Sequence, residues 1–156
     1  MYKRQSLTGH LVLSTVHTND SVAAITRMID IGIESYLLAS TLKAVLAQRL
    51  VRKLCSFCKE SISLDSHIGT LNKGTNVFKA KGCNNCNNTG YQGRVGIFEL
   101  FLITDEIKEA INSGETENRL SNLAFSNENK LSHSGYDLVL RGVTSIEEIL
   151  RVTSEK

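Results

Sequence analysis

The stretches Cys55-Ser56-Phe57-Cys58 and Cys83-Asn84-Asn85-Cys86 contain all four cysteines of the 156-residue chain. Each stretch has two residues between its cysteines, and 24 residues separate the two stretches. Two thiolates three positions apart can bind one side of a metal ion, and a second pair completes a tetrahedral site. The spacing therefore predicts a four-cysteine metal site that closes residues 59–82 into a loop.

We interpret this site as a structural zinc site with Cys55, Cys58, Cys83 and Cys86 as its ligands. A catalytic zinc keeps an open coordination position, and four thiolates leave none. Two alternatives use the same cysteines: an iron centre of the rubredoxin kind, and a zinc ribbon that binds nucleic acid. A thiol redox protein fits poorly, because neither pair opens a helix after a strand and bound zinc would mask the thiols.

The composition is that of a globular protein, with 41% hydrophobic and 22% charged residues. No apolar run reaches the ~18–20 residues of a membrane span. The first residues lack the apolar region of a signal peptide. Thiols in a chain without an export signal favour a reducing compartment, and so metal binding over disulfides. We therefore expect a cytoplasmic protein.

Charge is unevenly distributed along the chain. Residues 1–93 contain 11 Lys and Arg against 5 Asp and Glu, whereas residues 94–156 contain 7 against 11. Positive charge in the first part would suit an anion or an acidic partner. The alternative is that Arg52, Lys53, Lys59, Lys79 and Lys81 offset the negative charge of the thiolates.

The front of the chain has the pattern of an α/β protein. Residues 10–17 form a nearly continuous apolar run, which predicts a strand buried on both faces. Polar residues at 18–21 can cap a helix that ends at Gly32, and a second helix is expected over about residues 35–48. Residues 49–54 should form a strand. Because a strand of the buried type needs neighbours on both sides, we expect the chain to be the end of a larger domain.

The rest of the chain alternates between loops and helices. Residues 61–76 predict a solvent loop, and residues 90–96 predict a glycine-rich turn before an apolar strand. Thr104 can cap a helix with acidic residues in its first turn, where negative charge is favourable. Further helices are expected over about residues 115–125 and 132–141, and the pattern from Thr144 to Glu147 predicts a capping box for the last helix.

Two histidines and two arginines are candidate site residues. His10 and His17 bracket the first predicted strand, and His17 follows the end at which α/β proteins bind ligands. An imidazole there can hydrogen-bond a phosphate oxygen. Arg49 and Arg52 are candidates for binding an anion, because they lie between a helix and the first cysteine pair. For each residue, the alternative is an ordinary polar side chain in contact with solvent.

Residues 8–19 resemble the histidine box of the secretion ATPases that drive type II secretion and type IV pilus assembly. The similarity continues in fixed order through Thr26-Arg27, Ile31–Ile33, Leu46–Arg52, both cysteine pairs, Gly90–Glu99 and Gly142–Thr153. The cysteines resemble those of the assembly motors, because the pilus-retraction motors lack this site. The sequence of residues 27–48 is most similar to that of the type II secretion branch, with the pilus-assembly branch as the alternative.

The resemblance implies the C-terminal portion of a RecA-like P-loop ATPase domain with a tetracysteine zinc subdomain and C-terminal helices. It also implies a homo-hexamer at the cytoplasmic face of the inner membrane. Its partners would be the inner-membrane platform and cytoplasmic-domain proteins of the machine, and no nucleic acid is expected. His10 and His17 would lie near the phosphates, with His17 as the γ-phosphate sensor, while Arg49 and Arg52 remain the candidate cofactor-binding arginines.

The sequence also departs from the family. It contains no G-x-x-x-x-G-K-[ST] loop to hold phosphates and no acidic strand before the histidine box to place Mg²⁺. Because phosphoryl transfer depends on these parts, ATP and Mg²⁺ are expected only in the full-length protein, and this chain alone should be inactive. The predicted parts are residues 1–5 as a non-matching leader, 6–54 as the end of the ATPase core, 55–93 as the zinc subdomain, and 94–156 as a return strand with helices.

Overall fold

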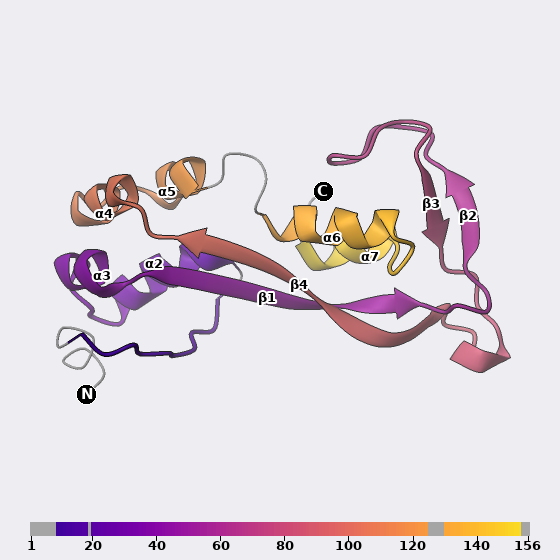
Figure 1. Cartoon of the computed structure of the whole chain (residues 1–156), viewed down its shortest axis with the longest axis horizontal. Coiled ribbons are helices and arrows are strands. Elements are labelled where there is room, and N and C mark those ends of the chain that lie inside the picture. The colour runs from indigo at the N-terminus through magenta and orange to yellow at the C-terminus, as the bar shows by residue number, and fades with distance from the viewer. Residues whose placement is uncertain (1–8, 19, 125–129, 154–156) are drawn as a thin grey trace. The chain divides into compact units, whose positions relative to one another are not determined.

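The computed structural model describes residues 9–18, 20–124 and 130–153. Its contacts divide the chain into two compact units, and each unit is built from two separate stretches of sequence (Figure 1). The first unit contains residues 1–47 and 99–129, and the second contains residues 48–98 and 130–156. Helices and strands occur in both, which confirms the predicted α/β class. Among the described helices, none has the length and apolar character that crossing a bilayer requires.

Two long strands pair in a two-stranded sheet: β1 (Ala44–Leu54) and β4 (Tyr91–Leu102). The N–H of Ile103 donates to the carbonyl of Lys43 at one end, and the N–H of Cys55 donates to the carbonyl of Gly90 at the other. These bonds show that the strands run in opposite directions. Both strands pass from one unit into the other, β1 after Ala47 and β4 after Phe98, and the predicted parts ending at residues 54 and 93 stay predictions.

In the part of the first unit that the structure describes, the helices are α2 (Ser21–Asp30), α3 (Ser35–Thr41), α4 (Asp105–Asn112) and α5 (Glu117–Ala124). They pack with the end of β4 around one apolar core. Its fully buried members include Ile25, Phe101 and Ile111. Because these side chains come from both stretches of the unit, the core forms only when residues far apart in sequence meet.

Two helix starts in this unit follow their sequence signals. The carboxylate of Asp20 accepts a hydrogen bond of 2.7 Å from the N–H of Ala23 at the start of α2. The hydroxyl of Thr104 accepts from the N–H of Ile107 at the start of α4. Such caps satisfy backbone donors that have no partner within the helix. Both predicted helix starts are therefore confirmed.

The second predicted helix was wrong beyond residue 41. Helix α3 ends at Thr41, and β1 begins at Ala44. Val45 and Ala47 are half-buried, whereas Leu46 and Gln48 are exposed, which is the two-residue period of a strand. Leu42 and Val45 also fit a helical spacing, so the periodicity alone was ambiguous. Pairing with β4 decides in favour of the strand.

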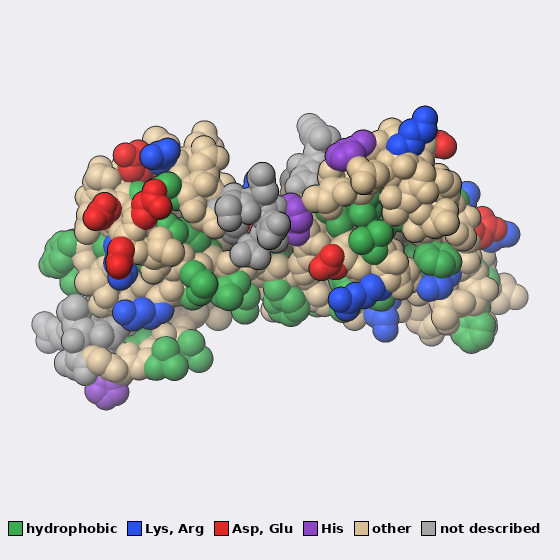
Figure 2. Space-filling model, turned by 45° about the horizontal axis from the view of Figure 1, so that its top comes forward, with side chains coloured by type: hydrophobic (Ala, Val, Ile, Leu, Met, Phe, Trp, Pro, Cys, Tyr) green, Lys and Arg blue, Asp and Glu red, His purple; other side chains and the backbone are tan. Residues whose placement is uncertain are grey.

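The strand predicted at residues 10–17 is absent from the structure. This segment has no regular secondary structure, and Leu11 and Leu13 are 84% and 86% exposed. Exposed hydrophobic side chains are visible on the face shown in Figure 2. A strand buried on both faces needs a partner on each side. Among the residues that the structure describes, no strand pairs with this segment.

The second unit combines a hairpin, one 3₁₀ turn and two helices: β2 (Glu60–Ser63), β3 (Asn76–Lys79), η1 (Asn84–Cys86), α6 (Leu131–Leu140) and α7 (Ile146–Thr153). The hairpin is antiparallel, with Ile62 opposite Val77. Helix α6 packs against both α7 and β3 (Figure 1). The loop predicted over residues 61–76 was therefore wrong at both ends, where burial of Val77 favours strand pairing.

Two further predictions in this unit need correction. Residues 91–96 belong to β4, so the predicted turn is limited to Gly90, which has a φ of +77°. The N-terminus of α7 is capped one residue later than predicted, because the hydroxyl of Ser145 accepts from the N–H of Glu148. Thr144 instead donates its hydroxyl to the carbonyl of Arg52 at 2.8 Å. The Thr144 hydroxyl therefore bonds the end of β1 and does not cap α7.

Gly69, at the tip of the loop between β2 and β3, lies against the ring of Tyr136 in α6. Replacing Gly69 by Ala should lower the free energy of unfolding by about 1–3 kcal/mol more than replacing Gly74 by Ala. Both glycines have positive φ, +57° and +87°, so both substitutions strain the backbone. Only a Cβ at residue 69 would meet Tyr136, because nothing lies within 4 Å of one at residue 74. Urea unfolding of the two variants measures the difference, and equal losses would contradict the packing.

Candidate metal centre

The two cysteine pairs lie in tight backbone turns. Cys55 follows the last residue of β1, and its carbonyl accepts from the N–H groups of Cys58 and Lys59. The second pair spans η1, where the carbonyl of Cys83 accepts from the N–H of Cys86 at 3.1 Å. Asn87 follows in the left-handed region with a φ of 52°, which asparagine tolerates better than most residues. Each turn directs both of its thiols to the same side.

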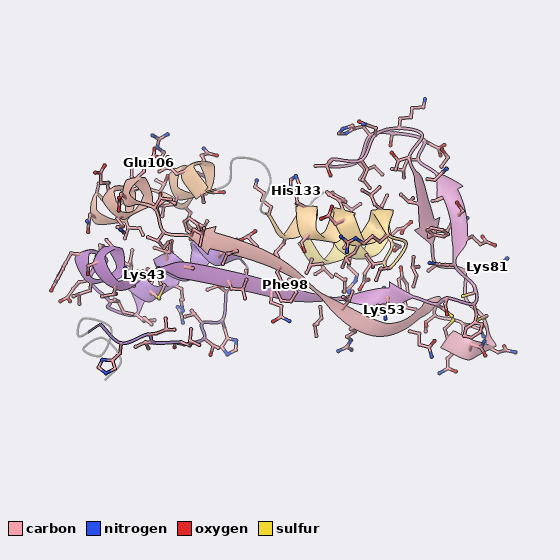
Figure 3. The ribbon with its side chains drawn as sticks, viewed as in Figure 1. Lys43, Lys53, Lys81, Phe98, Glu106 and His133 are labelled. Atoms are coloured by element: carbon pink, nitrogen blue, oxygen red, sulfur yellow. The ribbon has the colours of Figure 1, made fainter. Side chains whose placement is uncertain are left out.

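The four sulfur atoms lie within 4.8 Å of one another. Figure 3 shows sulfur atoms gathered beside η1, near the labelled Lys81. The Sγ–Sγ distances are 3.9 Å for Cys55 and Cys83, 3.8 Å for Cys58 and Cys86, and 3.8 Å for Cys83 and Cys86. A tetrahedral ion with bonds of about 2.3 Å to sulfur separates its ligands by about 3.8 Å. The thiols are free, so the donor set and the spacing both fit a metal such as zinc.

Backbone N–H groups point at two of the sulfur atoms. Gly82 donates to the Sγ of Cys58 at 3.4 Å, while Cys83 and Gly90 donate to the Sγ of Cys86 at 3.3 and 3.2 Å. Burial raises the pKa of Cys58 to about 11, against the opposing hydrogen bond from Gly82. Burial also acts to raise the pKa of Cys86, but hydrogen bonds from the two N–H groups and from the Cys83 and Cys58 thiols together outweigh it and lower that pKa to about 6. Unequal thiols of this kind are typical of neighbouring groups that cannot all ionise without a cation.

The lysines near the centre have other partners. Lys81 forms an ion pair of 2.5 Å with Glu60, and Lys79 lies 3.9 Å from the same carboxylate. The amino group of Lys59 donates to the carbonyl of Gly142 at 2.8 Å. The pKa of Lys81 is raised mainly by its hydrogen bond to Glu60, with a smaller contribution from the charge of Cys58. Charge compensation of the thiolates by lysines is therefore a minor effect.

A buried carboxylate lies where β1 meets α7. Glu148 has a side-chain exposure of 0% and accepts hydrogen bonds from the guanidinium groups of Arg52 and Arg151, each through Nε and Nη2 at 2.7–3.0 Å. The backbone N–H of Arg52 donates to it as well. The guanidinium of Arg52 also lies 4.1 Å from the centre of the Tyr91 ring, and the Tyr91 hydroxyl bonds Ser145 at 2.7 Å. We call these five residues the Glu148 cluster.

Sequence reasoning did not identify Glu148, Tyr91 or Ser145 as parts of one cluster. All three lie inside the motifs on which the family resemblance rests. Glu148 and Arg151 are three positions apart on a helix, so they share a face. That spacing was the available signal, but the burial of a glutamate on this face depends on strand β1, which is 96 residues away in sequence.

The structure places the other predicted site residues as follows. His10 and His17 are exposed and lie in the first unit. Arg49 is half-buried in β1, and Arg52 follows it in the same strand. The four cysteines are therefore the predicted site residues that the structure brings together. Arg52 binds Glu148 through Nε and Nη2, and the roles proposed for the histidines and arginines at a nucleotide stay predictions.

Comparison with known proteins identifies the family. Residues 2–151 match the family model described as "Type II/IV secretion system protein", so the chain belongs to this family. The match includes residues 2–5, which the motifs alone left outside the resemblance. The resemblance to secretion ATPases inferred from the motifs is thus confirmed.

Individual relatives agree with the family assignment. The chain is 48% identical to type II secretion system protein E of Aeromonas hydrophila over 155 residues, which cover 96% of this chain and 31% of that protein. It is 44% identical over 155 residues to type II secretion system ATPase E of Vibrio cholerae, again with 96% and 31% covered. The chain therefore spans about a third of the length of these curated relatives.

A solved structure agrees with the fold. The pilus retraction motor PilT with bound ADP matches with a TM-score of 0.61 over 97% of this chain and 36% of that chain. The two sequences are 20% identical, so the likeness concerns the fold alone. The fold of this chain therefore resembles part of that motor.

The pKa of Glu148 yields a test of the cluster. Burial acts to raise this pKa, but hydrogen bonds from Arg151 and Arg52 outweigh it and lower the pKa from 4.5 to about 2. The stabilisation is therefore fully present above pH 4.5 and is lost as the pH falls through about 2. In the folded chain, the ¹³C shift of the Glu148 carboxyl should stay at its ionised value down to about pH 3.5. A titration midpoint near 4.5 would contradict the double arginine contact.

Proposed function

We propose that this chain is the C-terminal part of a hexameric ATPase that powers type II protein secretion. The observation that carries the proposal is the identity of 40–48% with type II secretion proteins along almost the whole chain, together with the four-cysteine cluster. In this role ATP hydrolysis by the full-length protein drives assembly of a pseudopilus. ATP and Mg²⁺ bind mainly through residues outside this chain.

The four cysteines hold one Zn²⁺ ion as a structural element. Supporting this, the sulfur spacing matches the edge of a zinc–thiolate tetrahedron, and three backbone N–H groups stabilise negative sulfur. When bound, the ion cross-links the two turns and leaves no open position for chemistry. The cysteines of this chain then position the hairpin of β2 and β3, which lies between the two pairs in sequence.

Metal content tests this assignment. The chain purified under reducing conditions should contain one zinc per molecule, measured by plasma emission spectrometry. Replacing Cys86 by Ser should remove the metal, because three thiolates no longer balance the ion, whereas replacing the exposed Ser56 by Ala should leave the content unchanged. Iron with a visible thiolate absorption would replace the zinc assignment by a rubredoxin-like one, and a metal-free wild-type chain would refute both.

The histidines are the side chains of this chain that we place nearest ATP. His17 senses the γ-phosphate and His10 lies close to the phosphates, in line with their positions in a segment that resembles the histidine box. The segment is exposed, and its Leu11 and Leu13 are unburied. In the full-length protein we expect the missing strand partners to cover these leucines and thereby bring the imidazoles to the nucleotide. Of the two candidate arginines, Arg49 contributes to the nucleotide site. The guanidinium of Arg52 is already bound to Glu148, so a role for Arg52 at the nucleotide is secondary.

Replacing His17 by Ala in the full-length ATPase should lower kcat for ATP hydrolysis by about 10²-fold, the usual effect of removing one donor to a developing negative charge. Replacing His67 by Ala is the matched control, because this exposed histidine lies in the hairpin loop of the second unit. Release of phosphate measures both variants. Equal activity of the His17 variant and wild type would refute the sensor role.

The assembly and its surroundings follow from the same proposal. The full-length protein forms a homo-hexamer at the cytoplasmic face of the inner membrane. Its partners there are the platform protein and the cytoplasmic-domain proteins of the secretion machine. This chain alone, without the phosphate-binding loop, does not hydrolyse ATP.

A further inference from the structure

The Glu148 cluster touches the sequence on both sides of the metal centre. Arg52 lies three residues before Cys55, and Tyr91 lies five residues after Cys86. Both side chains bond the first turn of α7 or its cap, Arg52 through Glu148 and Tyr91 through Ser145. The strand that enters the first cysteine pair and the strand that leaves the second are therefore held on the same helix end.

Backbone bonds continue this connection on the side of the first pair. The N–H of Leu54 donates to the carbonyl of Val143 at 2.8 Å. The carbonyl of Arg52 accepts from the Thr144 hydroxyl at 2.8 Å. Arg52 and Leu54, near the end of β1, are thus bonded to the segment that leads into α7, and the residue after Leu54 is the ligand Cys55.

Gly90 makes the corresponding connection on the side of the second pair. Its N–H donates to the Sγ of Cys86 at 3.2 Å, and its carbonyl accepts from the N–H of Cys55 at 2.9 Å. A Cβ at this position would lie too close to Ala80, so the close approach requires glycine. Since Tyr91 is the next residue, a displacement of the Tyr91 end of β4 would also displace a donor to one sulfur and an acceptor from another ligand residue.

We propose that Glu148 is a positioning residue for the metal centre. Its carboxylate binds Arg52, its backbone N–H donates to the Ser145 hydroxyl that bonds Tyr91, and together these contacts couple metal retention to the docking of α7. The inference rests on the metal binding proposed above. The cluster holds the backbone of both cysteine pairs in the spacing that the ion needs. In return, the bound ion holds the two strand ends against α7, because coupling between two binding equilibria is reciprocal.

The alternative is that Glu148 only stabilises the fold. A buried carboxylate with two arginines can serve specificity of packing and nothing else. The two roles differ in one measurable respect. A purely structural glutamate contributes the same stabilisation to α7 with and without metal, whereas a positioning glutamate contributes it mainly when the metal is bound.

The first test measures metal release. The zinc-loaded chain is mixed with the chromogenic chelator 4-(2-pyridylazo)resorcinol, and the rate of zinc transfer is recorded. Replacing Glu148 by Gln should raise the rate by about 10-fold, within the range found when residues that support metal ligands are changed. Glu147→Gln is the matched control, because Glu147 is exposed on the same helix turn and should leave the rate unchanged. Tyr91→Phe, which removes only the hydroxyl bonded to Ser145, should raise the rate by a few-fold and serves if the Gln variant fails to fold.

The second test separates positioning from stabilisation. Hydrogen exchange of the α7 amides is measured for wild type and for the Glu148 and Tyr91 variants, each with zinc and after its removal. We expect zinc removal to raise exchange by about 10-fold in wild type and by much less in the variants, because coupling requires the intact cluster. Equal factors in wild type and variants would overturn the proposal, as would wild-type release rates in both variants. If the wild-type chain retains no zinc, the metal assignment itself fails. This outcome is distinct from a failure of the positioning role of Glu148, in which zinc is bound but the variants behave like wild type.

Discussion

The close approach of four cysteine thiols is the physical constraint around which this part of the second unit is arranged. The sulfur atoms lie within 4.8 Å of one another, and the nearest lysines bind Glu60 or a backbone carbonyl. Backbone N–H groups stabilise the negative charge of Cys86, while burial disfavours it at Cys58. The divalent cation proposed above would remove this conflict, because its binding displaces the protons of all four thiols and its charge compensates the thiolates. In the proposed zinc form, the ion would close the loop between the cysteine pairs in addition to the apolar packing of Leu64, Leu71 and Val77.

Glu148 is the second charged group that organises this unit. Removing a carboxylate from water is unfavourable unless hydrogen bonds replace its hydration, and two arginines and a backbone N–H do so here. Each arginine comes from a different element, so the ion cluster joins β1 to α7. The Thr144 hydroxyl bonds the same end of β1. Together with the cluster, this bond positions the end of β1 and hence Cys55, the residue that follows the strand.

The first unit, by contrast, leaves some of its apolar side chains unburied. Helices α2 to α5 and the end of β4 form its core. Leu11 and Leu13, in the segment before α2, are exposed. Their apolar run is appropriate for the interior of a larger sheet, which agrees with relatives about three times as long. The segment that resembles the histidine box thus has the composition of a buried strand, although it forms no strand in this structure.

The sequence by itself determined the cysteine site, the family, and the ends of several helices, because each depends on short-range chemistry. Ligand spacing, the caps at Asp20 and Thr104, and the glycine after α6 act within a few residues. Tertiary structure decided the remainder. Residues 44–48 became strand through pairing with β4, residues 10–17 formed no strand, and Thr144 bonded Arg52 instead of capping α7. Burial of Glu148 likewise required residues 96 positions apart to meet, and no local pattern encodes such a contact.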